Sequence, residues 1–175
     1  MEKRSVILEK QYLLSKNLIM IPAPGSIKPA RVFLPKGVWT SFHTGKEYLG
    51  GGSVEINEET QEKDAILMVH ENSVIVERTE SDIHDGHCEL RVYALRNNVR
   101  IDADVYDDDP EIPALSVSFK RSGHSIHIAS DGAKPYTVRM VNMYAKSAAN
   151  GMVLIDGNDS VITPDAWACT MEVVF

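Results

Sequence analysis

Residues 31–52 constrain the fold of this chain more than any other stretch, because they place two tight turns between three short segments. In the first turn, Pro35 fixes its own φ angle and Gly37 accepts a positive φ, so the chain can reverse direction there. Residues 44–46 form the second turn, and three glycines follow at residues 50–52. Two hairpins within so short a stretch predict antiparallel β structure.

The second half of the chain alternates apolar and polar residues more regularly. This pattern is clear at residues 99–106 and 115–120, and the dipeptides ending at Gly123 and Gly132 mark turns. Strands of about five residues with frequent turn signals are typical of a β-sandwich. After residue 22 no segment of useful length has helical periodicity. The sequence therefore predicts an all-β fold.

The turns and polar stretches divide the chain into four parts. Residues 23–80 are predicted to form a proximal antiparallel β-sandwich module, and residues 88–175 a distal one. The polar residues 81–87 between them are interpreted as a linker. The first 22 residues contain a continuous apolar run at residues 18–21, which suits either a buried strand or the end of a helix.

Composition excludes several classes of function. The 175 residues are 43% hydrophobic and carry a net charge of −7, whereas a phosphate-binding surface needs an excess of basic residues. No apolar run is long enough to span a membrane, and the first ten residues lack the apolar core of a signal peptide. The two cysteines form no disulfide framework, and Cys169 is expected to be a small buried residue. We expect a cytoplasmic protein with no nucleic-acid or membrane partner.

Three stretches resemble the family 31 glycoside hydrolases, which include α-glucosidases and α-xylosidases. RVFLPKGVWTSFHTGKEYLGGG is similar to the family's V-Y-L-P-x-G-x-W, D-F-W-T-G and K-x-Y-x-G-G motifs, which open the β-sandwich after the catalytic barrel. QYLLSKNLIMIPAP resembles the last barrel strand, Q-F/Y-L-L-G-x-x-L-L-V-A-P-V, with Ser15 for glycine and Ile21 for alanine. AILMVHENSVI resembles P-L-F-V-R-E-G-S-I-I, with His70 for arginine and Asn72 for glycine. The resemblance implies that residues 1–22 are a remnant of the end of a (β/α)8 barrel.

The resemblance also implies a function. Glycoside hydrolysis in this family needs two carboxylates, and the motifs that carry both lie upstream of the stretches matched here. We therefore expect a non-catalytic C-terminal portion of an α-xylosidase or α-glucosidase, with no cofactor, whose role is to support the barrel and the subunit contacts. The alternative is a free-standing carbohydrate-binding β-sandwich.

The N-terminal residues also predict a partner. If the neighbouring barrel strands are missing, large apolar side chains before Pro22 lose their cover, and soluble monomers rarely expose so large a patch. We expect this segment to pair with the same segment of a second copy, giving a homo-oligomer.

Aromatic residues of the hairpin stretch are the candidate sugar contacts. Trp39 and Tyr48 could stack against a sugar ring, and Trp167 is a similar but weaker candidate. The alternative for Trp39 is that it packs beneath the hairpin. The sequence alone leaves both interpretations open.

Two polar clusters could hold a metal, but neither has the spacing of a known site. The acidic group Asp102, Asp104 and Asp107–Asp109 lacks the glycine and glutamate positions of an EF-hand loop, so a solvated strand end is expected. His84, Asp85, His87 and Cys88 form one loose group, whereas zinc-ligand pairs normally occur twice. We predict no metal site.

Overall fold

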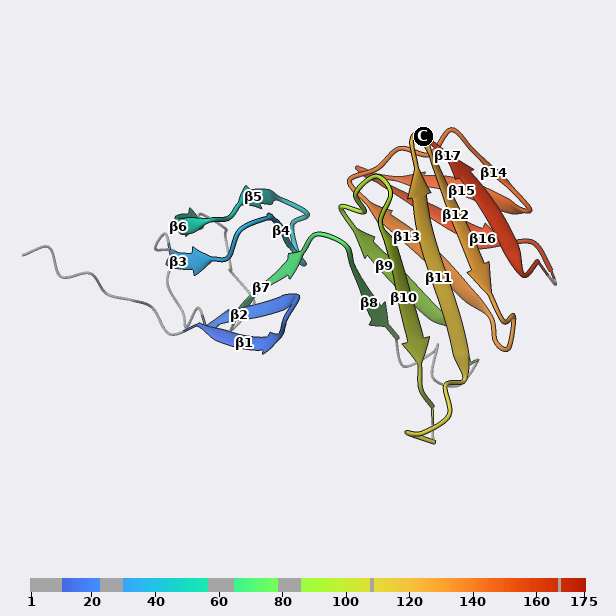
Figure 1. Cartoon of the computed structure of the whole chain (residues 1–175), viewed down its shortest axis with the longest axis horizontal. Helices are drawn as coiled ribbons and strands as arrows, with labels where there is room; N and C mark the ends of the chain where they lie inside the picture. The colour runs from blue at the N-terminus through green and yellow to red at the C-terminus, as the bar shows by residue number, and fades with distance from the viewer. Residues whose placement is uncertain (1–10, 23–29, 57–64, 79–85, 108, 167) are drawn as a thin grey trace, which may run out of the picture. The chain divides into compact units, whose positions relative to one another are not determined.

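The structure is a computed structural model that describes residues 11–22, 30–56, 65–78, 86–107, 109–166 and 168–175 (Figure 1). Within these ranges every regular element is a β-strand and no helix is found, so the predicted all-β fold is confirmed. The same residues contain no helix that could cross a membrane. The chain divides into two compact units, residues 1–71 and residues 72–175, and each is described by itself.

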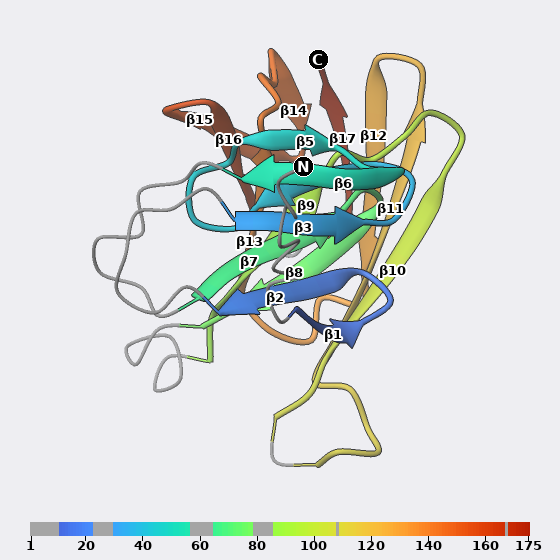
Figure 2. The ribbon, with the colours of Figure 1, turned by 90° about the vertical axis from the view of Figure 1, so that its left-hand side faces the viewer.

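The first unit contains a five-stranded antiparallel sheet and a separate two-stranded ribbon (Figure 2). The sheet has the strand order β1 (Tyr12–Ser15), β2 (Leu18–Pro22), β7 (Ala65–His70), β4 (Val38–Ser41) and β5 (Glu47–Leu49). The ribbon pairs β3 (Ala30–Leu34) with β6 (Gly52–Ile56). Of the two hairpins predicted from residues 31–52, the second is present as the β4–β5 pair. The first is not, because β3 pairs with β6 instead of with β4.

The core of the first unit lies between the sheet and the ribbon. It gathers one or two side chains from each of six strands: Ile19, Ile21, Val32, Leu34, Trp39, Tyr48, Ile56, Ile66 and Met68. Leu34 and Trp39 are 0% and 1% exposed, so both are buried in this core. Gly50 makes this packing possible, since a Cβ atom there would collide with the carbonyl oxygen of Pro35. The ribbon can therefore close only over a glycine at this position.

Over the described residues 11–22 the N-terminal segment is part of this sheet, whereas a separate remnant of a barrel was expected. β2 pairs with β7 along its whole length, from Leu18 opposite Val69 to Pro22 opposite Ala65. Ile19 and Ile21 are buried in the core of the unit. The apolar run at residues 18–21 is thus an internal strand of the sheet, with one face buried and the other half-buried.

The second unit is a sandwich of two five-stranded sheets that lie face to face (Figure 1). One sheet has the order β10 (Arg100–Val105), β11 (Leu115–Ser122), β12 (Ser125–Ser130), β17 (Thr170–Val174) and β14 (Ser147–Ala149). The other has the order β15 (Gly151–Asp156), β16 (Asp159–Pro164), β13 (Tyr136–Val141), β9 (Cys88–Tyr93) and β8 (Ser73–Glu77). β9 and β13 pair in parallel, whereas the other neighbouring strands are antiparallel.

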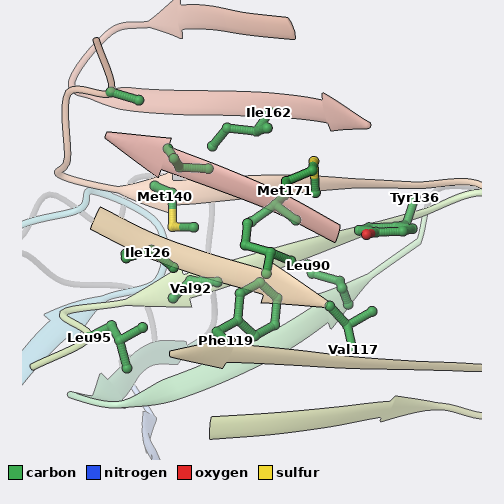
Figure 3. Close-up of a cluster of buried hydrophobic side chains, with 14 of the residues drawn as sticks. Leu90, Val92, Leu95, Val117, Phe119, Ile126, Tyr136, Met140, Ile162 and Met171 are labelled. Carbon is green, nitrogen blue, oxygen red and sulfur yellow. The ribbon is translucent and has the colours of Figure 1, made fainter. Parts of the chain in front are cut away.

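Side chains from both sheets fill the interior of the sandwich (Figure 3). On β11 the buried residues Leu115, Val117 and Phe119 alternate with two half-buried serines, as the sequence pattern predicts. The same alternation buries Ile126 and Ile128 on β12. Burial of these rows against the facing sheet is the main contribution to the stability of this unit.

The boundary between the units differs from the one expected. Residues 65–69 and 74–76 were predicted to be consecutive strands of one module, but β7 belongs to the first unit and β8 to the second. The turn between them is present, because Asn72 has a φ of 57°. From this turn onward the chain pairs with β9, and the pairing begins where the backbone N–H of Asn72 donates to the carbonyl of Tyr93 at 2.9 Å. The expected linker, residues 81–87, lies outside the described residues except for Gly86 and His87.

Candidate functional site

Trp39 and Tyr48 are core residues, which favours packing beneath the hairpin over stacking against a sugar. Trp39 is 1% exposed, and its indole Nε1 donates a hydrogen bond of 2.8 Å to the carbonyl of Pro35. The His70 ring covers it at a centroid distance of 4.7 Å. Tyr48 is 8% exposed and lies opposite Trp39 in the β4–β5 pair. Neither ring presents an open face, so the packing interpretation holds for Trp39.

His70, which replaces the arginine of the family motif, also has a structural role. Its Nε2 atom lies 3.1 Å from the carbonyl oxygen of Lys36. The ring fills the space over Gly37, where a Cβ atom would collide with it. Gly37 itself has a φ of 129°, a conformation that favours glycine. His70 therefore holds the first turn of the hairpin stretch and stacks on Trp39.

The acidic group on β10 is divided among separate partners. Asp102 binds the Arg100 guanidinium at 2.8 Å, and Asp104 accepts a hydrogen bond of 2.7 Å from the Ser116 hydroxyl. Both carboxylates are exposed, in agreement with the expected solvated strand end. Among the described residues no group of three or more His, Cys, Asp or Glu side chains is placed to hold a metal ion.

Asp107 is the centre of a small charged cluster after β10. Its two carboxylate oxygens each accept a hydrogen bond of 2.9 Å from the Lys134 ammonium, and Arg78 approaches at 2.7 Å. The hydrogen bond from Lys134 and the two positive charges lower the pKa of this carboxyl. Asp107 thus fixes the Lys134 side chain, which is only 10% exposed, beside the loop described next.

The second unit contains a pocket of about 650 Å³ at one end of the sandwich. Two loops form it: the one between β12 and β13, and the one between β16 and β17. Its lining residues come from these loops and from the residue before β9: His87, Asp131, Gly132, Ala133, Lys134, Pro135, Tyr136, Thr163, Pro164, Asp165, Ala166, Ala168 and Cys169. These strand ends meet because β9 and β13 run in parallel and β16 runs antiparallel to them.

Several polar groups of the pocket are already engaged. Asp131 accepts hydrogen bonds of 3.1 Å from the backbone N–H groups of Ser116 and Ala133, one on each carboxylate oxygen. Tyr136 is 6% exposed and joins the end of the core cluster to the pocket, and burial raises the pKa of its phenol (Figure 3). Asp165 is exposed, and no hydrogen bond from another described residue to its carboxylate is found.

The sequence did not reveal this pocket. The Asp131-Gly132 turn was recognised, and Gly132 has a φ of 68°, but a turn signal does not show which loop lies beside it. Cys169 was expected to be buried, whereas it is exposed and lines the pocket. It lies just before β17, in which Met171 and Val173 are buried in the core. Cys169 continues the same every-second-residue pattern, but the burial does not extend beyond the end of the strand. Cys88, in contrast, is buried in the core.

Comparison with protein-family models matches both parts of the chain. Residues 84–175 match the model described as the C-terminal domain of alpha-xylosidase YicI. Residues 2–75 match the model described as the glycosyl hydrolase family 31 C-terminal domain. Comparison with curated proteins finds no match.

Solved structures show the same fold. A family 31 dextranase from Flavobacterium johnsoniae, complexed with glucose, aligns with a TM-score of 0.74 and 15% identity over 94% of this chain and 26% of its own. The cycloalternan-forming enzyme from Listeria monocytogenes, in complex with a pentasaccharide substrate, aligns at 0.71 and 15% identity over 96% and 19%. A family 31 α-xylosidase from Xanthomonas citri aligns at 0.55 and 22% identity over 75% and 16%.

The chain therefore spans about a quarter or less of the length of these enzymes. The two family models together cover both structural units, and each describes a C-terminal domain. On this evidence the chain belongs to the family 31 glycoside hydrolases and corresponds to their C-terminal β domains.

Proposed function

We propose that this chain is the non-catalytic C-terminal portion of a hydrolase that acts on α-xylosides or α-glucosides. The observation that carries the proposal is the match of both units to C-terminal domain models, one of which is that of an α-xylosidase. The catalytic carboxylates of such an enzyme would lie in a barrel outside these residues. The α-xyloside specificity is supported by the name of one matched family, and the α-glucoside specificity by the resemblance of the sequence motifs.

The role of the chain would be to support the barrel through the exposed edge of the first unit. β1 lies at the edge of its sheet, and Tyr12, Leu13 and Leu14 are 47%, 66% and 54% exposed. Three neighbouring large apolar side chains on an edge strand favour a protein partner. We propose the barrel of the parent enzyme as this partner, and contacts between subunits as a second use of the same strand.

A free-standing carbohydrate-binding module built on the hairpin aromatics has less support. Trp39 and Tyr48 would have to be its stacking platform, and both are buried. A cytoplasmic location also stays a proposal, for which the two free thiols of Cys88 and Cys169 are the support.

The test is an activity assay on the full chain. With aryl α-xylosides and aryl α-glucosides, the purified protein should give no turnover above the uncatalysed rate. A preparation from cells carrying an empty vector controls for contaminating hydrolases. Turnover that survives this control and follows the protein through a sizing column would overturn the proposal.

A further inference from the structure

We propose that the pocket of the second unit binds a neutral, hydroxyl-rich ligand, a saccharide of one or two rings. The site goes beyond the proposed supporting role, so its failure would leave that role standing. The proposal rests on the size of the pocket, on the charges that line it and on the one carboxylate that it leaves available.

The size suits a small ligand. Binding sites for small molecules typically have volumes of about 300–1,000 Å³ and mostly apolar walls with a few polar groups. This pocket has a volume of about 650 Å³. Its apolar wall includes Pro135, Pro164, Ala133, Ala168 and Tyr136. Proline and alanine side chains present C–H groups that can cover the apolar face of a sugar ring.

The charges disfavour an anionic ligand. Lys134 is the one Lys or Arg residue among the described lining residues, and its ammonium donates two hydrogen bonds to Asp107, which it shares with Arg78. Asp131 and Asp165 add two negative charges to the wall. A phosphate or carboxylate ligand would meet uncompensated negative charge. A divalent cation would lack ligands, because no suitable group of three acidic, His or Cys side chains is found among the described residues.

Asp165 is the polar group that a saccharide would use. Asp131 already accepts two backbone hydrogen bonds, whereas the Asp165 carboxylate receives none from the described residues. Sugar hydroxyls donate hydrogen bonds, and a carboxylate is a strong acceptor for them. The Asp165 backbone is held independently of its side chain, because its N–H donates to Asn150 at 3.0 Å and its carbonyl accepts from Ala168 at 3.0 Å. Asp165 therefore has a fixed position and an available carboxylate.

The experiment measures saccharide binding to the full chain by saturation-transfer difference NMR. D-Xylose and maltose are the neutral probes, and D-glucuronate is the anionic one. We expect saturation transfer to the neutral probes, a Kd about tenfold weaker in Asp165→Ala, and no transfer to glucuronate. Asp102→Ala is the matched control, since Asp102 is an exposed carboxylate on β10, outside the lining residues.

A second variant distinguishes the pocket from the rest of the surface. Ala133 is exposed at the pocket wall, so Ala133→Trp should fill the space without disturbing the core, and it should abolish binding while the melting temperature stays unchanged. Absence of transfer to both neutral probes in the native chain would overturn the proposal. So would equal Kd values in the native chain, Asp165→Ala and Ala133→Trp, or binding of glucuronate as tight as that of the neutral sugars.

Discussion

The Trp39→Ala substitution should unfold the first unit and leave the second folded. Trp39 is 1% exposed and packs in a core cluster of nine buried residues. Truncation of a buried Trp or Phe to Ala typically costs about 3–5 kcal/mol. Small domains have stabilities at the low end of about 5–15 kcal/mol, so the loss would remove most of the stability of this unit. The core cluster of the second unit shares no residue with it, so that unit should keep its stability.

Hydrogen exchange followed by mass spectrometry can measure the two units separately. In Trp39→Ala, peptides from β4 and β7 should exchange much faster, and peptides from β11 and β12 should exchange as in the native chain. Trp39→Phe is the control: it keeps a ring in the core but removes the indole N–H that donates to Pro35, so about 1–2 kcal/mol should be lost. Unchanged protection of β7 in Trp39→Ala would refute the burial argument. Equal loss in both units would refute their independence.

Three further predictions follow from single features. The pKa of the Asp107 carboxyl is lowered in the folded state, so its contribution to stability is complete above the ordinary carboxyl pKa and is lost as pH falls through the lowered value. The urea midpoints of the native chain and of Asp107→Asn should therefore differ at neutral pH and become equal in acid. Tyr93→Phe should leave the urea midpoint unchanged or raise it, because the buried Tyr93 hydroxyl has no hydrogen-bond partner among the described residues. In the native chain this phenol should ionise only near its raised pKa of about 12. Leu13→Glu should shift the full chain toward monomer in sedimentation velocity if β1 mediates self-association, and identical sedimentation of both proteins as an oligomer would exclude that strand.

The sequence predicted the parts of the fold whose two faces differ. On β11 and β12 one face meets the core and the other meets solvent, so alternation identified both strands. The same holds for the glycine turns at Gly37 and Gly123, where the positive φ leaves few other residues possible. In these elements the burial or backbone conformation of each residue follows from its position in its own strand or turn, so the local sequence pattern is enough to predict the element.

The sequence failed where a strand's environment depends on distant partners. β2 was interpreted as a remnant of a barrel because of its resemblance to a barrel strand, whereas it lies between β1 and β7 in the sheet of the first unit. β15 was not predicted at all. Its apolar residues Met152 and Leu154 are 69% and 66% exposed, so the positions of apolar residues in this strand do not indicate which face of the sheet is buried. Strand order is likewise invisible locally, which is why β8 was assigned to the wrong unit.

The candidate site could not be predicted for the same reason. Most of its lining residues lie in two loops, and each loop alone has the composition of an ordinary turn. Only the pairing of β13 with β9 and β16 brings the loops together. The aromatic residues that the sequence did single out, Trp39 and Tyr48, were selected by type, and type alone does not distinguish a stacking surface from a core.

The parallel pairing of β9 with β13 has a consequence for synthesis of the protein on the ribosome. β9 emerges early, but one of its neighbours, β13, follows only after β10, β11 and β12 have been made. Until then Leu90 and Val92 of β9 have half of their sheet missing, and the facing sheet is incomplete until β17 appears at the end of the chain. Contacts between such distant segments slow folding and leave apolar strands open to aggregation. Ribosome-bound chains that stop before β17 should therefore recruit chaperones, whereas the first unit can complete its sheet once β7 has emerged.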